Sequence, residues 1–344
     1  MLTKDTKAEP IIVRWLAGLM IAALTAAYLK FHADTHTVER LSTAAEYLLQ
    51  GKTHWLTFQN RLLSPALIKG IQIVTGLSWL QSFQILIGVC LGGGSGFLLW
   101  RSWKNTGKSI LGIKQAVAWF SLAFLFNHIW SYPWDYTGAV LFMLVMVWGK
   151  DCFHSLADLK SKRLAVLLIL LILNRESSLI VFAGLILTAI AIGFHEKKWS
   201  QSLKAIFLLS LASLSNIIGV IYVRHALFTS PTRPLGQEGP EAAVGNFNSV
   251  IPNLRNMVHA DSGYEFGGTI IVTFLFIVCS ILLLLILRDL RRSTIIIPGK
   301  MLIRSCFCLA SVAIVFFANM AELRAYFELI PIAILLAFES RSHA

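Results

Sequence analysis

Most of this chain consists of apolar runs about twenty residues long, and a lipid environment leaves such runs few ways to fold. Hydrophobic residues make up 56% of the 344 residues and charged residues only 14%, against about 25% charged residues in soluble domains. Inside a bilayer every backbone N–H and C=O group must be satisfied within the protein. Runs such as 164–173 and 277–287 lack the alternation of barrel strands. The sequence therefore predicts an all-α, polytopic transmembrane protein.

About ten runs qualify as membrane spans, and we expect them to form a single transmembrane domain over residues 1–344. Three of these runs are shorter than the roughly 20 residues that cross a bilayer. Short helices would leave their outer ends below the membrane surface, around an outer-facing, water-accessible polar cavity. The expected spans cover residues 11–31, 81–100, 109–127, 137–149, 163–173, 177–194, 204–225, 266–287, 302–319 and 327–339, and the short ones are 137–149, 163–173 and 327–339.

The distribution of basic residues predicts the orientation. With the N-terminus inside and residues 62–79 not crossing, the inner segments hold 20 of the 30 lysines and arginines, as the positive-inside rule requires. Both termini are then cytoplasmic. This topology also accounts for the net charge of +12. The sequence has no basic stripe interleaved with aromatic residues, so we do not expect nucleic acid as a partner.

Two outer loops follow from this topology, at residues 32–80 and 226–265. The first contains the segment 38–50, whose apolar residues recur at helical spacing and predict an amphipathic helix along the interface. It also contains residues 62–79, which Pro65 and two glycines interrupt. We interpret this piece as a re-entrant or interfacial helix that begins near Pro65, because proline is tolerated in the first turn of a helix.

Polar residues interrupt the apolar pattern at four places, all on the predicted outer side. A charge within or beside a span costs on the order of a few kcal/mol unless it is paired or faces a wet cavity, so such residues indicate function by default. Because they share one side of the membrane, we expect them to form one polar site. The four clusters are Asp34 with Arg61, Asp135, the run Asn174-Arg175-Glu176, and Glu322 with Arg324.

Each cluster has a chemical and a structural interpretation. A carboxylate such as Asp34 can act as a general base or orient a phosphate through a metal, or it can be a solvated acid at a helix end. Arginine offers a planar donor fork that suits phosphate, but Arg61 can also snorkel to the interface. Asp135 either lines a pocket or caps its helix. The charges of the last two clusters can bind a substrate or neutralise each other within their turns.

Familiar cofactor sites are absent from the sequence. There is no Walker-type glycine loop, no Gly-x-Ser-x-Gly elbow and no H-E-x-x-H motif. The five cysteines show neither metal spacing nor a disulfide framework. No resident cofactor or protein metal site is predicted, and a divalent metal acting through Asp34 stays open.

Taken in order, these motifs resemble the bacterial multi-pass membrane proteins of the GT-C glycosyltransferase superfamily and related exopolysaccharide-pathway proteins. The resemblance rests on an acid after the first span, Arg-Leu-Leu-Ser-Pro at 61–65, an aromatic-rich turn with Asp135, Asn-Arg-Glu at 174–176, and Glu-Leu-Arg at 322–324 before a final proline-containing helix. It implies a cell-envelope enzyme of the bacterial inner membrane. Such an enzyme moves a sugar from a polyprenyl-phosphate donor to a glycan, lipid or protein acceptor on the outer face.

The resemblance also implies roles for the site residues. Asp34 matches the acid that is the usual catalytic candidate, and the counterparts of the phosphate-binding arginines are Arg61, Arg175 and Arg324. Glu176 and Glu322 would hold these arginines or bind sugar hydroxyls, and Asp135 with Asn174 would line the pocket. The chain departs from better-known members because it has no large outer soluble domain and no Asp-x-Asp or Glu-x-Asp pair in its first outer loop. Asp34 is then the single candidate base, and metal dependence is in doubt.

Two other classes of function remain open from the sequence. A transporter or flippase of a lipid-linked glycan predicts access from both sides and charged residues deep in the inner half. A non-catalytic membrane subunit of a polysaccharide assembly complex predicts that variants of the polar residues still function.

Overall fold

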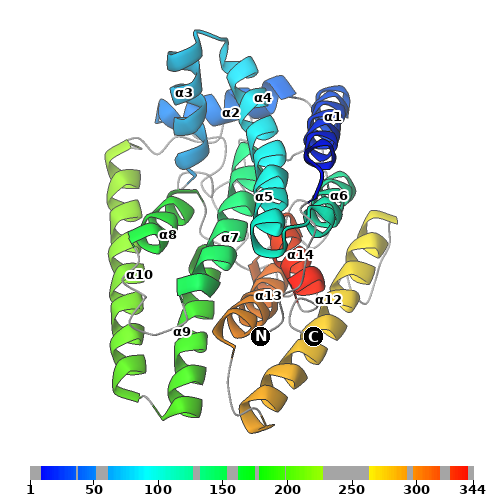
Figure 1. Cartoon of the computed structure of the whole chain (residues 1–344). Coiled ribbons are helices and arrows are strands. Elements are labelled where there is room, and N and C mark those ends of the chain that lie inside the picture. Colours follow the sequence, from blue (N-terminus) through cyan, green and yellow to red (C-terminus); the bar gives the residue numbers. More distant parts are fainter. Residues whose placement is uncertain are drawn as a thin grey trace.

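The computed structural model describes residues 9–35, 38–51, 61–126, 132–152, 162–174, 178–197, 199–227, 263–292, 297–317 and 326–339. Every regular element within these residues is a helix, so the all-α prediction is confirmed (Figure 1). The elements are α1 Ile11–Thr35, α2 Val38–Leu49, α3 Leu63–Thr75, α4 Trp79–Gly88, η2 Val89–Gly93, α5 Gly94–Thr106, α6 Ile110–Leu125, α7 Pro133–Cys152, α8 Lys162–Asn174, α9 Ser178–Glu196, α10 Trp199–Leu227, α12 Gly263–Arg292, α13 Pro298–Phe317 and α14 Leu329–Glu339.

Five helices in the described part of the chain are long and apolar enough to cross a membrane. They are Ile11–Asp34, Trp79–Thr106, Ser178–Glu196, Trp199–Leu227 and Thr273–Arg291. Four further apolar helices have 10–17 residues. Among these, α8 has 13 residues and α14 has 11, which correspond to about 20 Å and 16 Å at 1.5 Å per residue.

The expectation of a short span at 137–149 is wrong. Helix α7 begins at Pro133 and has 20 residues, so it is about 30 Å long. Pro133 starts the helix because proline lacks only an N–H that the first turn leaves unpaired in any case. The aromatic and acidic residues that follow it, which the sequence placed in a turn, belong instead to the first turn of α7.

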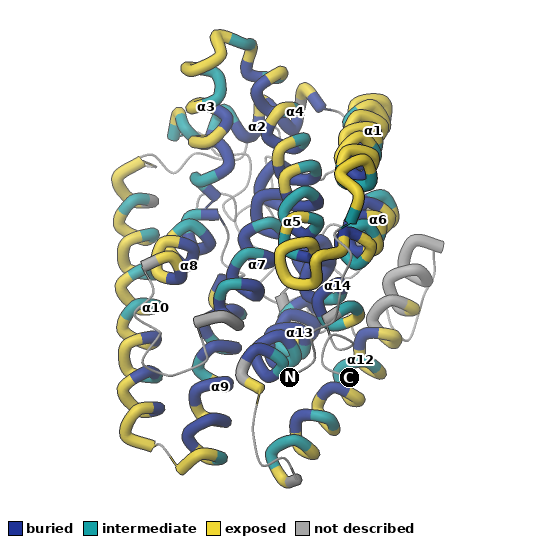
Figure 2. Tube along the Cα trace, viewed as in Figure 1, coloured by how far each residue is buried: buried dark blue, intermediate teal, exposed yellow. Residues whose placement is uncertain are grey.

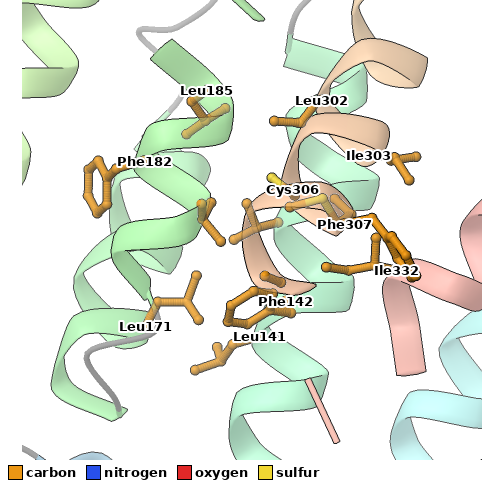
Figure 3. Close-up of a cluster of buried hydrophobic side chains, with 14 of the residues drawn as sticks. Leu141, Phe142, Leu171, Phe182, Leu185, Leu302, Ile303, Cys306, Phe307 and Ile332 are labelled. Carbon is orange, nitrogen blue, oxygen red and sulfur yellow. The ribbon is translucent and has the colours of Figure 1, made fainter. Parts of the chain in front are cut away.

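Two hydrophobic cores meet at α7. One core joins α7, α8, α9, α13 and α14, and Figure 3 shows its centre around Phe142, Phe182, Cys306 and Phe307. The other core joins α7 and α14 to α1, α2, α4, α5 and α6. A helix that is apolar around its whole circumference is buried on all sides, and α7 accordingly occupies the centre of the molecule (Figures 1 and 2).

The outer helices present apolar side chains on their exposed faces. Figure 2 shows long exposed stretches on α1, α10 and α12, and the best apolar windows of α10 and α12 are only 6% buried. Trp15, Phe207 and Leu284 are each at least 65% exposed. Exposed apolar surfaces of this extent mark a membrane or protein interface, and on helices that are also long enough to span they indicate lipid contact.

Helices α3 and α4 form a hairpin that positions the start of α3. Pro65 lies in the first turn of α3, as predicted, and the helix ends at Gly76, whose φ of 70° suits glycine. Ser78 then begins α4 with a capping box, in which its hydroxyl accepts from the N–H of Gln81 at 3.2 Å. Residues 79–106 continue as one helix through the π-helical turn η2. The start of α3 is thereby directed towards α7 and α8 (Figure 1).

Residues Val38–Leu49 form α2, which lies against this hairpin. Leu41, Ala45 and Leu48 are fully buried, and the indole N–H of Trp79 donates to the carbonyl of Ser42 at 2.9 Å. The apolar face of α2 is therefore covered by the protein itself.

Candidate functional site

The first turn of α7 holds a fully buried acid. Asp135 has no exposed surface, and its Oδ2 accepts a hydrogen bond from the backbone N–H of Tyr132 at 2.9 Å. The ring of Tyr132 stacks on that of Trp134, with centroids 4.5 Å apart. An acid in the first turn that reaches back to the residue before the helix satisfies one of the unpaired N–H groups there. Asp135 therefore caps α7, which was one of its two sequence interpretations.

Asn174 connects the ends of three helices. It is the last residue of α8 and is fully buried. Its Oδ1 accepts from the hydroxyl of Ser64 on α3 at 2.9 Å, and its Nδ2 donates to the carbonyl of Trp134 on α7 at 2.9 Å. An amide with partners on both ends holds these backbones in one arrangement, because an unmade buried hydrogen bond costs about 1–3 kcal/mol.

Arg61 lies beside this connection. It precedes α3, is only 8% exposed, and its guanidinium carbon is 5.4 Å from the centroid of the Trp134 ring. A guanidinium over an indole face gains a cation–π attraction. The structure thus brings Arg61, Asp135 and Asn174 together, although they lie on three segments far apart in the sequence.

Glu328 also belongs to this group, and the sequence analysis did not identify it. It is 7% exposed and lies directly before α14. Its Oε1 is 2.9 Å from the position that a Cβ on Gly138 would take, and Nδ2 of Asn174 is 3.0 Å from the same position. The absence of a side chain at Gly138 lets both polar groups approach α7. We call Arg61, Ser64, Trp134, Asp135, Asn174 and Glu328 the polar junction.

A sequence signal for Glu328 was available. It is an acidic residue inside the expected span 327–339, and an acid within a span is a functional candidate by default. Aromatic packing holds its segment in place: Tyr326 stacks on Phe126 at 5.8 Å, and Phe327 meets Tyr136 edge-on at 4.9 Å. Burial raises the pKa of Tyr326 above its ordinary value.

An aromatic layer extends from α7 to α1. The hydroxyls of Tyr28 and Tyr136 share a hydrogen bond of 2.9 Å. His32 is 1% exposed, and its ring lies 6.3 Å from Tyr28 and 5.9 Å from Tyr136. Tyr28 and His32 are four residues apart and so share one face of the helix. This face of α1 points into the protein.

Asp34 lies on a different face of α1. Two helical residues correspond to a rotation of about 200°, so Asp34 faces away from the direction of His32, and its side chain is exposed. No hydrogen bond or ion pair joins it to the residues that the structure describes. The structure therefore does not bring Asp34 into contact with the polar junction.

The remaining predicted site residues lie outside the described residues. These are Arg175, Glu176, Glu322 and Arg324, together with most of the expected loop 226–265. In the sequence, Arg175 directly follows Asn174 and Arg324 comes four residues before Glu328. Asn174 and Glu328 are thus close in sequence to two of these charged residues.

An apolar cavity of about 810 Å³ lies beside α3 and α7, and none of the residues of the polar junction lines it. Its lining comes from α3, α4, η2, α5 and α7. On α3 the lining starts at Ala66, two residues after Ser64, and on α7 it starts at Thr137, two residues after Asp135. The π-helical turn contributes Cys90 and Gly93, and such turns occur frequently at functional sites. Along α3 and α7, the cavity lining thus begins within one helical turn of a junction residue.

Within the described ranges, no three His, Cys, Asp or Glu side chains lie close enough together to hold a metal ion. Comparisons with protein-family models, with curated proteins and with solved structures gave no significant match to this chain.

Proposed function

We propose that this protein is a membrane glycosyltransferase of the GT-C type, which transfers a sugar from a polyprenyl-phosphate-linked donor to an acceptor at the outer face of the membrane. One observation carries the proposal: a buried arginine directly precedes α3, a helix that lines one side of a large apolar cavity. Arg61 and the polar junction suit a phosphate, and the cavity of about 810 Å³ suits part of a hydrocarbon chain. A lipid phosphate combines these two properties in one molecule.

Helix N-termini add positive charge to the polar junction, which also holds the carboxylates of Asp135 and Glu328. Helices α3, α7 and α14 begin at or beside it, and the N-terminus of a helix carries a partial positive charge and unpaired N–H groups. Arg175 and Arg324, close by in the sequence, would add charge to that of Arg61. Positive groups placed where a leaving phosphate develops its charge supply much of the rate enhancement in such transfers.

The proposed transfer assigns a task to each part of the site. The cavity holds the first part of the lipid chain, and Arg61 binds the phosphate. Asn174 keeps the start of α3 against α7, so that Arg61 is held in position. Glu176 and Glu322 would orient the arginines or bind sugar hydroxyls. The acceptor, a glycan, lipid or protein, would approach from the outer side.

Native mass spectrometry of gently purified protein tests donor binding directly. We expect the wild type to retain a polyprenyl phosphate or its sugar adduct, and Arg61→Ala to lose it. Lys69→Ala is the matched control, because Lys69 lies on α3, the helix that Arg61 precedes, with an exposed side chain and should leave lipid retention unchanged. Ala66→Trp fills the cavity and should reduce retention of the long chain while the phosphate site stays intact.

A second assay tests transfer. Purified protein in liposomes, given a polyprenyl-phosphate sugar and extracts of envelope acceptors, should release polyprenyl phosphate and glycosylate an acceptor. Movement of the lipid-linked sugar between leaflets without transfer would favour the flippase function instead. Neither lipid retention nor transfer in the wild type, together with a partner lost during purification, would contradict the proposal and favour the assembly-subunit function.

A further inference from the structure

We propose that Glu328 is the general base of the transfer, in place of the acid at the end of the first span; this inference rests on the proposed function. The described part of the polar junction contains two carboxylates, those of Asp135 and Glu328. Their surroundings differ, and so does that of Asp34. These differences decide which of the three acids can act on an acceptor hydroxyl.

Asp135 is committed to its own helix. Its Oδ2 accepts from the N–H of Tyr132, and no part of the residue is exposed. A carboxylate oxygen that caps a helix is held on the backbone and is turned away from a substrate. Asp34 is unsuitable as the base for a different reason. Its side chain is exposed on the face of α1 that turns away from Tyr28 and His32.

Glu328 lies beside other residues of the polar junction. It is buried on the short segment before α14 and extends its carboxylate to Gly138 of α7. Nδ2 of Asn174 approaches the same position on Gly138, and it donates to the carbonyl of Trp134, over whose ring Arg61 lies. The carboxylate is therefore placed inside the polar junction. A sugar attached to a phosphate at Arg61 would have its anomeric carbon in this region.

The reaction step follows from this placement. The oxygen of the acceptor hydroxyl forms a bond to the anomeric carbon, and its proton passes to the Glu328 carboxylate. The bond between the anomeric carbon and the phosphate oxygen breaks at the same time. Its electron pair remains on the polyprenyl phosphate, where Arg61 neutralises the charge. A positioned general base contributes about 10²–10⁴-fold to such a rate.

Glu328→Gln tests the proposal because it preserves the shape of the side chain and removes its basicity. In the liposome transfer assay, we expect kcat to fall by about 10²–10⁴-fold while KM for the donor and lipid retention in native mass spectra stay near wild-type values. Glu328→Asp should recover part of the rate. Glu39→Gln, on the exposed surface of α2, is the matched control and should transfer at the wild-type rate.

Gly138→Ala provides an independent test that keeps the carboxylate. The added Cβ would lie 2.9 Å from Oε1 of Glu328 and 3.0 Å from Nδ2 of Asn174, so the ends of both side chains must shift. We expect a lower kcat and a moderately lower unfolding midpoint. Gly219→Ala, where nothing lies within 4 Å of the new Cβ, is its control. This variant decides the matter if Glu328→Gln does not fold.

The outcomes separate this inference from the proposed function. A wild-type protein that transfers sugar, with Glu328→Gln and Gly138→Ala equally active, overturns the role of Glu328 alone. Loss of transfer in Asp34→Asn with full activity in Glu328→Gln also overturns it and returns the role to Asp34. A wild-type protein that neither retains the lipid nor transfers sugar overturns both proposals.

Discussion

The hydroxyl of Ser64 donates a hydrogen bond of 2.9 Å to Oδ1 of Asn174, which lies 110 residues further along the chain. This bond joins the first turn of α3 to the end of α8. Because the amide of Asn174 also donates to Trp134, the two interactions hold Arg61, which precedes α3, over the Trp134 ring. The position of the Arg61 side chain thus depends on residues that do not contact the proposed phosphate.

The bond between Ser64 and Asn174 can be measured with a double-mutant cycle. We expect Asn174→Ala to lower the free energy of unfolding by about 1–3 kcal/mol, because it leaves buried polar groups without partners. Ser64→Ala should cost less, and the coupling energy should be about 0.5–1.5 kcal/mol. The measurement is equilibrium unfolding in mixed micelles. Asn105→Ala, an exposed amide at the end of α5, is the control, and strictly additive effects of the two junction variants would contradict the prediction.

The contact between α9 and α13 predicts that a second substitution restores the stability lost through a first one. A Cβ on Gly184 would collide with Sγ of Cys306, in the core that Figure 3 shows. Gly184→Ala should therefore destabilise the protein by about 1–3 kcal/mol. Adding Cys306→Ala removes the sulfur atom and should restore most of the loss, because the remaining atoms near the new Cβ are 3.6 Å away. Thermal unfolding of the single and double variants checks this, and a double variant less stable than Gly184→Ala would show that the helices approach each other differently.

Lipid contact of α10 predicts a depth-dependent penalty for charge. Leu211 is 49% exposed near the middle of this helix, so Leu211→Lys should cost about 2.5–3.5 kcal/mol if its surroundings are hydrocarbon. Ser200→Lys, exposed at the helix end, should cost little because lysine reaches the interface there. Membrane-insertion efficiency of the two variants is the measurement. Equal insertion would indicate that this face of α10 is not in contact with lipid.

The orientation predicted from basic residues can be tested across one helix. Ile73 is 72% exposed on α3 and Asn105 is exposed near the end of α5. The helix of 28 residues between these regions is about 42 Å long, enough to span a bilayer. In a background without the five native cysteines, we expect an impermeant thiol reagent added outside intact cells to label Ile73→Cys and not Asn105→Cys. Labelling of both positions from outside would refute the topology.

Helix class, the main apolar segments and several site candidates could be predicted because their causes are local. Each of these features is determined by residues close together in the sequence. This holds for a hydrophobic run, for Pro65 in the first turn of its helix, and for a polar residue within an apolar segment. This is why Arg61, Asp135 and Asn174 could be singled out before their contacts were known. The extent of α7 could not be predicted, because the sequence pattern around Pro133 suits a turn and a first helical turn equally well.

The sequence by itself thus determined a chain of apolar helices with a few costly polar residues, because lipid solvation and backbone hydrogen bonding operate segment by segment. Only the tertiary structure decided which of these polar residues meet. The rotation of α1 turns Asp34 away from His32 and into exposure, and the packing of α14 against α7 brings Glu328 to Gly138. Such pairings depend on how whole helices pack, and the free energy that selects them comes from contacts between residues far apart in the sequence.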